Sequence, residues 1–211
     1  LRDLVDGLLS DRRNAVAYGR QLPHPGASVL AAHGRAFNYP AQARTKTLGD
    51  APLLGIKTCF SSDAFAAYRR DAMMQLGGFP LDVIGSEDAH VAGRALLAGH
   101  QVAYVAKACA WHSHDYRVGE EFRRYFDIGV FYRRERWIAQ SFGTAGGEGR
   151  RFVQSELAAV RAAGQWWRVA EIGLRSLAKL AGSRLGHLEP RLPLSFKRRV
   201  SMFPGYWKGS R

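Results

Sequence analysis

Two short stretches of the chain combine residue types that often take part in catalysis. The first, SEDAH at 86–90, places the carboxylates of Glu87 and Asp88 side by side in a strongly basic chain. Acids in the first turn of a helix interact favourably with its dipole, by about 0.3–1 kcal/mol each, and need no chemical role. A carboxylate at a helix start that faces a cleft is also well placed to act as a general base. Taken alone, the stretch favours the dipole role.

The second stretch, WHSHDY at 111–116, contains two histidines. If the preceding strand continues, its two-residue period puts His112 and His114 on one face. Neutral imidazole is a common ligand of divalent metals, whereas a pair of surface or capping histidines is the alternative. Zinc is disfavoured because the chain has neither a closely spaced cysteine pair nor an HExxH motif.

The elements around these stretches alternate between helical and strand patterns, which favours an α/β fold. The first is a helix over 1–9, followed by a strand over 15–19 ended by Gly19 and a long irregular or broken-helix segment over 20–57. A strand and then a helix follow over 57–79, with the helix from about Asp71 to Gly77-Gly78. Next come a helix with Ser86 as its expected N-cap and Gly99 at its end, and a strand over 100–114. An acid and a histidine separated by one helix and one strand can meet at one end of a sheet, where ligands bind in open α/β folds.

The C-terminal part has a different character. We expect helices over 118–141, 150–163 and 165–185, a linker over 143–149 and a basic, aromatic tail over 196–211. In 165–185 the helical period pairs Trp166, Val169, Leu177 and Leu180 with Arg168, Arg175, Lys179 and Arg184. The domain boundary predicted from this change lies between 1–117 and 118–211.

Charge follows the same division. Of the net +13, residues 1–116 carry 12 Lys/Arg against 10 Asp/Glu, and residues 117–211 carry 19 against 8. Tryptophan and tyrosine favour the membrane–water interface, and each basic side chain near an anionic lipid surface contributes about 1 kcal/mol. This predicts that 118–211 binds an anionic membrane surface. A nucleic-acid-binding module is the alternative, because arginines among aromatics also suit phosphate contact and stacking.

Cysteine content and hydropathy set further expectations. Cys59 and Cys109 are predicted to be reduced, buried thiols, since so few cysteines give no sign of an oxidising compartment. No apolar run approaches the ~20 residues that span a bilayer, and no signal peptide opens the chain. The chain begins at Leu1 inside a helical pattern, which predicts that it is part of a longer protein.

One ordered set of motifs resembles a known family. The set is similar to motifs of the family 2 glycosyltransferases. It consists of FSSDAFAAYRRDAMMQLGGF at 60–79, SEDAH with AGHQVAY at 98–104, HSHDY at 112–116, RYFDIG at 124–129 and a basic end, KRRVS at 197–201 with Tyr206-Trp207. Within them the chain most resembles the bacterial rhamnosyltransferase-like branch that builds cell-surface polysaccharides. The ED pair alone is unspecific, whereas the ordered set is specific.

The resemblance implies an inverting transfer of a sugar, rhamnose by analogy with the branch, from a nucleotide-diphosphate donor on a GT-A type fold. Asp88 would be the base that deprotonates the acceptor hydroxyl, and Glu87 would orient it. His112, with His114 as the alternative, would bind a divalent metal, Mg or Mn, that clamps the leaving diphosphate. The donor or acceptor would be bound by Arg123, Arg124, Ser61, Ser62 and Asp63.

The family's nucleotide-binding half and its Asp-x-Asp metal motif precede the matching region, and no D-x-D occurs in this sequence. The chain is therefore expected to be the acceptor-side, C-terminal portion of a GT-A fold with a basic helical extension, inactive by itself. The implied partners are the donor and a saccharide or lipid-linked acceptor, not nucleic acid. The implied location is cytoplasmic, peripheral at the inner face of the plasma membrane. A metal-dependent hydrolase using Asp88, His112 and His114 is a further alternative.

Overall fold

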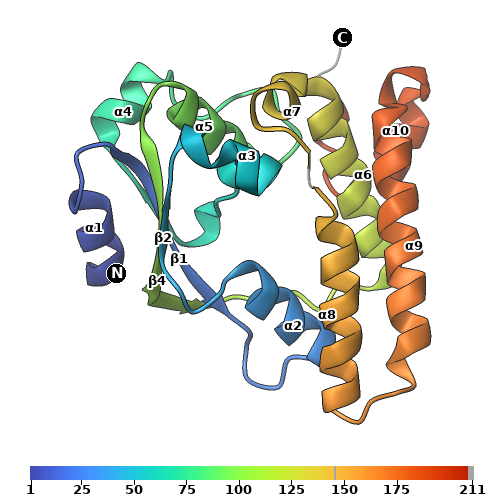
Figure 1. The fold of residues 1–211 in the computed structure, drawn as a ribbon. Coiled ribbons are helices and arrows are strands. Elements are labelled where there is room, and N and C mark those ends of the chain that lie inside the picture. The colour runs from blue at the N-terminus through green and yellow to red at the C-terminus, as the bar shows by residue number, and fades with distance from the viewer. Residues whose placement is uncertain (145, 209–211) are drawn as a thin grey trace. The chain divides into compact units, whose positions relative to one another are not determined.

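The computed structural model describes residues 1–144 and 146–208 (Figure 1). The chain divides into two compact units, which are described separately. Unit 1 comprises Leu1–Leu81, Glu87–Asp115 and Ile138–Phe152, and unit 2 comprises Asp82–Ser86, Tyr116–Trp137 and Val153–Arg211.

Unit 1 is built on a four-stranded mixed sheet. The strand order is β2 (Arg44–Lys46), β4 (Gln101–Trp111), β1 (Asn14–Leu22) and β3 (Ala66–Tyr68). The two long central strands are parallel, with Ala17 opposite Ala103, and both short outer strands are antiparallel to them. The carboxyl ends of β1 and β4 therefore lie at the same edge of the sheet.

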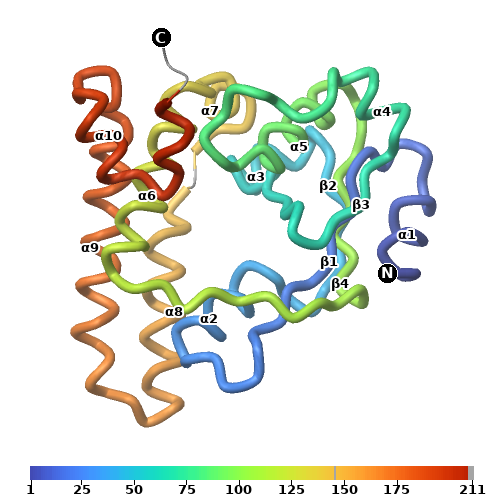
Figure 2. Tube along the Cα trace, turned by 180° about the vertical axis from the view of Figure 1, so that it is seen from behind, coloured from blue at the N-terminus to red at the C-terminus, as the bar shows by residue number. Residues whose placement is uncertain are grey.

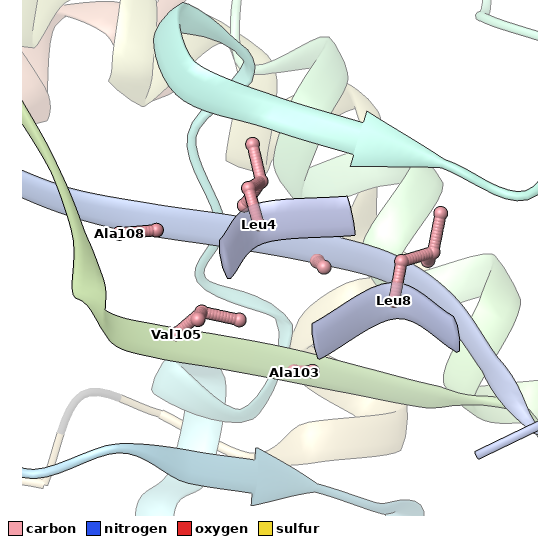
Figure 3. Packing of buried hydrophobic residues seen from close by; sticks show 6 residues of the cluster. Leu4, Leu8, Ala103, Val105 and Ala108 are labelled. Carbon is pink, nitrogen blue, oxygen red and sulfur yellow. The ribbon is translucent and has the colours of Figure 1, made fainter. Parts of the chain in front are cut away.

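Helix α1 (Arg2–Leu9) covers one face of this sheet (Figure 3). Leu4 and Leu8 are buried against small strand residues, Ala17, Ala103, Val105 and Ala108. A Cβ added at Gly7 would lie 2.4 Å from Cγ2 of Val105, so glycine at this position lets the helix approach the sheet closely. Alanine on the strands and glycine on the helix thus set the spacing between the two layers.

An aromatic cluster covers the other face. The ring centroid of Tyr18 lies 5.1 Å from that of Tyr104 and 6.0 Å from that of Phe60. Lys46 is buried beside them, and its ammonium donates hydrogen bonds to the carbonyls of Lys57 and Phe60. Burial lowers the pKa of Lys46 to about 7.

The remaining elements among residues 1–144 and 146–208 are mostly helical. They are α2 (Val29–Asn38), α3 (Ala51–Leu54), α4 (Arg70–Gln75), α5 (Glu87–Leu97), α6 (Val118–Arg134), α7 (Arg136–Phe142), α8 (Glu148–Ala162), α9 (Arg168–His187), α10 (Leu194–Val200) and five short 3₁₀ turns at 48–50, 55–59, 63–65, 189–191 and 206–208. Within the described residues, no helix combines the length and the apolar character needed to cross a bilayer.

Unit 2 is organised by a close crossing of α6 and α9, which run side by side in both views (Figures 1 and 2). A Cβ added at Gly186 would lie 2.2 Å from the carbonyl oxygen of Phe126, and one at Gly129 would lie 2.3 Å from that of Ser183. Backbone meets backbone at these positions, so no side chain fits. This explains the glycine of the RYFDIG motif.

The aspartate of the same motif holds the C-terminal tail. Asp127 is buried on α6, and its Oδ2 accepts a hydrogen bond of 2.7 Å from the backbone N–H of Met202, just after α10. Trp207, five residues further on, is only 1% exposed, with its ring centroid 6.5 Å from that of Phe126. The RYFDIG motif therefore packs directly against the basic, aromatic end of the chain.

Several elements agree with the sequence-based predictions. The helices at 1–9 and 118–134 form, α4 is followed by Gly77 and Gly78 with positive φ, α5 ends before Gly99, and 101–111 is a strand. Ser86 directly precedes α5, but its φ of +59° is left-handed, unlike the extended conformation typical of the N-cap that was expected there.

Other predictions were correct only in part, or wrong. The 20–57 segment contains helices α2 and α3, as the broken-helix alternative expects, and Ser28 Oγ starts α2 by accepting a hydrogen bond from the Ala31 N–H. Strand β2, in the same segment, was not predicted. β1 continues past Gly19 through a register shift, and the strand expected near residue 57 is a 3₁₀ turn followed by the short β3.

The helix expected over 118–141 is broken at Glu135 into α6 and α7. Cys59 is buried as predicted, whereas Cys109 is exposed. Both thiols are free. Residue 145 of the predicted linker lies outside the described residues.

Candidate functional site

Asp88 lies in the first turn of α5 and is largely shielded from solvent. Its Oδ1 accepts a hydrogen bond of 2.7 Å from the N–H of Ala89, and the N–H of Asp63 donates to the same carboxylate. Burial raises its pKa to about 6, and the nearby negative charges of Asp63 and Glu87 act in the same direction. The carboxylate is therefore ionised at neutral pH and is more basic than an exposed aspartate.

The loop Ser61-Ser62-Asp63 surrounds this acid. Ser61 is buried, and its hydroxyl donates to the main-chain carbonyl of Asp88 at 3.0 Å. Ser62 Oγ accepts a hydrogen bond of 2.7 Å from Nε2 of Gln21, near the end of β1. The structure thus brings Ser61 and Asp63 to Asp88, and anchors the loop to the carboxyl edge of the sheet.

Three further residues belong to this site and were missed from the sequence. Gln21 is buried, and its side-chain carbonyl accepts a hydrogen bond from the guanidinium of Arg35 on α2. The Tyr68 hydroxyl is buried and makes no hydrogen bond within the described residues. Burial, together with the charges of Asp88, Asp63 and Glu87, raises the pKa of Tyr68 above its ordinary value, so it remains a protonated donor. Nothing in the local sequence pattern marks these positions.

His112 and His114 lie together just beyond the end of β4. The N–H of His112 donates to the carbonyl of Leu22 at 2.8 Å, which continues the pairing with β1. Their Nε2 atoms are 3.0 Å apart, and the two rings are perpendicular. The segment is held by Ser113, whose hydroxyl accepts from the N–H of His24, and by Asp115, which accepts from Ser28. β4 itself ends at Trp111, so these contacts, not a strand period, hold the pair.

The distance between the two Nε2 atoms fits either a hydrogen bond between the rings or the binding of one cation by both. One neutral ring can donate a hydrogen bond to the other. Alternatively, two nitrogens about 2.1 Å from one cation, at roughly 90–110°, lie about 3.0–3.4 Å apart. In the part of the chain that the structure describes, no group of three or more His, Cys, Asp or Glu side chains could hold a metal. A cation at His112 and His114 would therefore need oxygen ligands from water or substrate.

The acid and the histidine pair are both tied to the carboxyl end of β1. Asp88 is linked through the Ser61–Asp63 loop to Gln21, and His112 is bonded to the next residue, Leu22. The candidate site in unit 1 is thus the carboxyl edge of the sheet, where ligands bind in open α/β folds.

The two predicted arginines belong to unit 2. Arg123 and Arg124 are exposed on α6. The guanidinium of Arg124 lies 5.5 Å from the ring centroid of Tyr116 and donates to its hydroxyl at 3.1 Å. Both residues are exposed, so their guanidinium groups are accessible to an anion.

Comparison with known proteins finds similarity to two O-antigen chain rhamnosyltransferases. The chain is 46% identical over 200 residues to the O-antigen chain rhamnosyltransferase WbaN of Salmonella anatum, and the aligned region covers 95% of this chain and 63% of that protein. It is also 46% identical over 198 residues to the O-antigen chain rhamnosyltransferase RfbN of Salmonella typhimurium, covering 94% of this chain and 63% of that protein. No family model and no solved structure matches the chain. The chain therefore spans less than two thirds of the length of these rhamnosyltransferases, to which it is similar over nearly all of its own length.

Proposed function

We propose that the chain belongs to a glycosyltransferase of family 2, of GT-A type, that transfers rhamnose from a nucleotide-diphosphate donor to a growing O-antigen-type polysaccharide. The relatives' names support the sugar and the acceptor class. The observation that carries the proposal is Asp88, a shielded carboxylate with a pKa raised to about 6, at the carboxyl edge of the unit 1 sheet. The same comparisons lend no support to a nucleic-acid-binding module or to a hydrolase.

In this reaction Asp88 takes the proton of an acceptor hydroxyl as its oxygen bonds to the anomeric carbon. The bond between that carbon and the donor diphosphate breaks, the diphosphate leaves on the opposite face, and the configuration inverts. Glu87 and the Asp63 N–H position the base. The buried, protonated Tyr68 hydroxyl is proposed to influence the basicity of Asp88, and the Ser61–Asp63 loop is proposed to hold the start of α5 in place.

Negative charge builds on the leaving diphosphate, so cationic groups near it accelerate the reaction. Arg123 and Arg124 are proposed to supply guanidinium groups for this purpose. His112 and His114 are proposed to hold a divalent cation, Mg or Mn, whose chemistry when bound is to neutralise diphosphate oxygens. The pair has the spacing of two ligands of one ion, which supports this assignment.

The test is a transfer assay with the complete gene product, a nucleotide-diphosphate rhamnose and a lipid-linked saccharide acceptor. The expected result is release of nucleoside diphosphate together with a rhamnosylated acceptor of inverted anomeric configuration. Donor hydrolysis without transfer would instead support the hydrolase, and retention of configuration would rule out Asp88 as the base of a single displacement.

Replacing both His112 and His114 by alanine is expected to weaken Mn²⁺ binding at least tenfold, because two of the proposed ligands are lost. Isothermal titration with Mn²⁺ measures this without any turnover. His187→Ala is the matched control, since His187 is exposed on α9 in unit 2 and should leave the affinity unchanged. Equal Mn²⁺ affinity in the double variant and the wild type would refute the metal assignment.

A further inference from the structure

Helix α9 has the reverse of the usual arrangement of apolar and charged residues. A surface helix normally buries its leucines and turns its charges to solvent. On α9, by contrast, Leu174, Leu177 and Leu180 are 55%, 65% and 49% exposed, whereas Arg175 is only 9% exposed. The sequence period pairs the same residues but does not reveal which side faces the protein.

The charged side of α9 points into unit 2. Arg175 donates to Glu121 at 3.0 Å, to Glu171 at 2.9 Å and to the carbonyl of Tyr116, and Lys179 forms an ion pair with Glu121 at 3.0 Å. Glu156 of α8 is buried among the same charges, and burial raises its pKa. Leucines on the inward side would stabilise the helix at least as well, because well-packed apolar residues often replace buried ion pairs without loss of stability. Packing within unit 2 therefore does not explain why the leucines of α9 face outward.

The outward residues form one continuous stripe. At about 100° per residue, positions 170, 177, 181 and 184 of α9 fall on one side of the helix, with 174 at one border and 173 and 180 at the other. Trp166 and Trp167 lie in the turn directly before the helix. We name the exposed Leu174, Leu177 and Leu180, together with the exposed Trp166 and Trp167, the α9 stripe. An apolar patch of this kind on a surface marks an interaction site.

The charges around the stripe indicate what covers it. Arg161 lies over the ring of Trp166, 5.6 Å from its centroid, at the start of the stripe, and the exposed Arg184 lies at its end. Exposed Arg191, Arg198 and Arg199 follow along the chain. Unit 2 as a whole carries 17 Lys/Arg against 8 Asp/Glu. A second copy of the chain would bring like charges against these, whereas an anionic lipid surface is complementary to them.

We propose that the α9 stripe lies in the headgroup region of an anionic bilayer, parallel to its surface. Leucines then replace water contacts by acyl-chain contacts, Trp166 and Trp167 occupy the interface, and the flanking arginines meet anionic headgroups. The outward face of α9 is thus a membrane-docking surface. It stands apart from sugar transfer, and it would bring the enzyme to a lipid-linked acceptor.

The experiment is flotation of the whole chain with vesicles of phosphatidylcholine alone or mixed with phosphatidylglycerol. The wild type is expected to float with the mixed vesicles, less as salt rises, and to show a blue shift of tryptophan emission. Leu174→Ser together with Leu177→Ser is expected to lower the partition coefficient at least tenfold, because two apolar anchors are lost. Both side chains are exposed, so the fold should persist, which circular dichroism checks.

Leu81→Ser is the matched control, since Leu81 is fully exposed in unit 1, outside the stripe, and should not change binding. Failure to bind anionic vesicles, equal binding to neutral vesicles, or binding unaffected by the two serines would each overturn the proposal. Concentration-dependent dimerisation that the two serines abolish would assign the stripe to a second copy instead. None of these readouts depends on turnover, so they are independent of the proposed transferase reaction.

Discussion

Replacing Asp88 by asparagine is expected to lower kcat/KM for rhamnose transfer by about 10²- to 10⁴-fold, the usual contribution of a general base. Asparagine has nearly the same shape and can still accept the hydrogen bond of the Ala89 N–H, so the loss isolates the basic function. A transfer assay with the complete gene product measures it.

Asp71→Asn is the matched control. Asp71 also lies in the first turn of a helix and accepts a hydrogen bond from the next residue's N–H, at 3.0 Å, but it is exposed on α4. It should retain wild-type activity. If both variants lost activity equally, the loss would come from removing a negative charge at a helix N-terminus, and Asp88 would not be the base.

The same substitution should stabilise the protein at neutral pH. The folded-state pKa of Asp88 is raised from 3.8 to about 6, so between these values the folded chain binds more protons than the unfolded chain. Stability is therefore lost as pH rises through this window, and the full cost remains above it. Asp88→Asn should raise the free energy of unfolding by about 1–2 kcal/mol at pH 7.5 and change it little below pH 4. Urea unfolding at the two pH values measures the difference, and destabilisation at pH 7.5 would contradict the account.

Trp207→Ala is expected to cost about 3–5 kcal/mol of unfolding free energy, the largest effect on stability that we predict. Trp207 is almost fully buried against Phe126, and the cationic groups of Lys197 and Arg134 lie 5.1 and 5.5 Å from its rings. Truncation leaves a cavity and removes these contacts. Thermal and urea unfolding measure the loss.

Two further variants sharpen this prediction. Trp207→Phe should cost much less, because the indole N–H makes no hydrogen bond within the described residues and the ring contact is largely kept. Trp166→Ala, at an exposed tryptophan, should leave stability in solution nearly unchanged. A loss below about 1 kcal/mol in Trp207→Ala would mean that the tail is not part of the unit 2 core.

Local patterns predicted where Asp88 and the histidine pair lie: Asp88 in the first turn of a helix, and His112 and His114 just after a strand. Their chemical roles come from the family resemblance and stay predictions. Tyr68 and Gln21 could not be predicted, because their roles come from contacts with residues 20 or more positions away. Tyr68 interacts with Asp88, and Gln21 bonds to Ser62, 41 positions along the chain.

The elements followed the same rule. α1 and β4 have sustained periods and were predicted. α2 was covered only by the prediction of an irregular or broken-helix segment, because prolines and glycines surround the apolar run that follows Ser28. The period of α9 was clear, but its orientation was not. Leucines usually face inward, and the carboxylates that draw Arg175 inward include Glu121, 54 positions earlier in the chain. Sequence periodicity gives the two faces of a helix, and tertiary contacts decide which is buried.

The central claim, that Asp88 is the base of sugar transfer, is tested most directly by the pH dependence of kcat/KM. Its pKa of about 6 predicts that the rate of the wild type falls tenfold per pH unit below about pH 6, as the carboxylate takes up its proton. The residual rate of Asp88→Asn should lack this inflection. An inflection near pH 6 that persists in Asp88→Asn, or wild-type rates in that variant, would contradict the account.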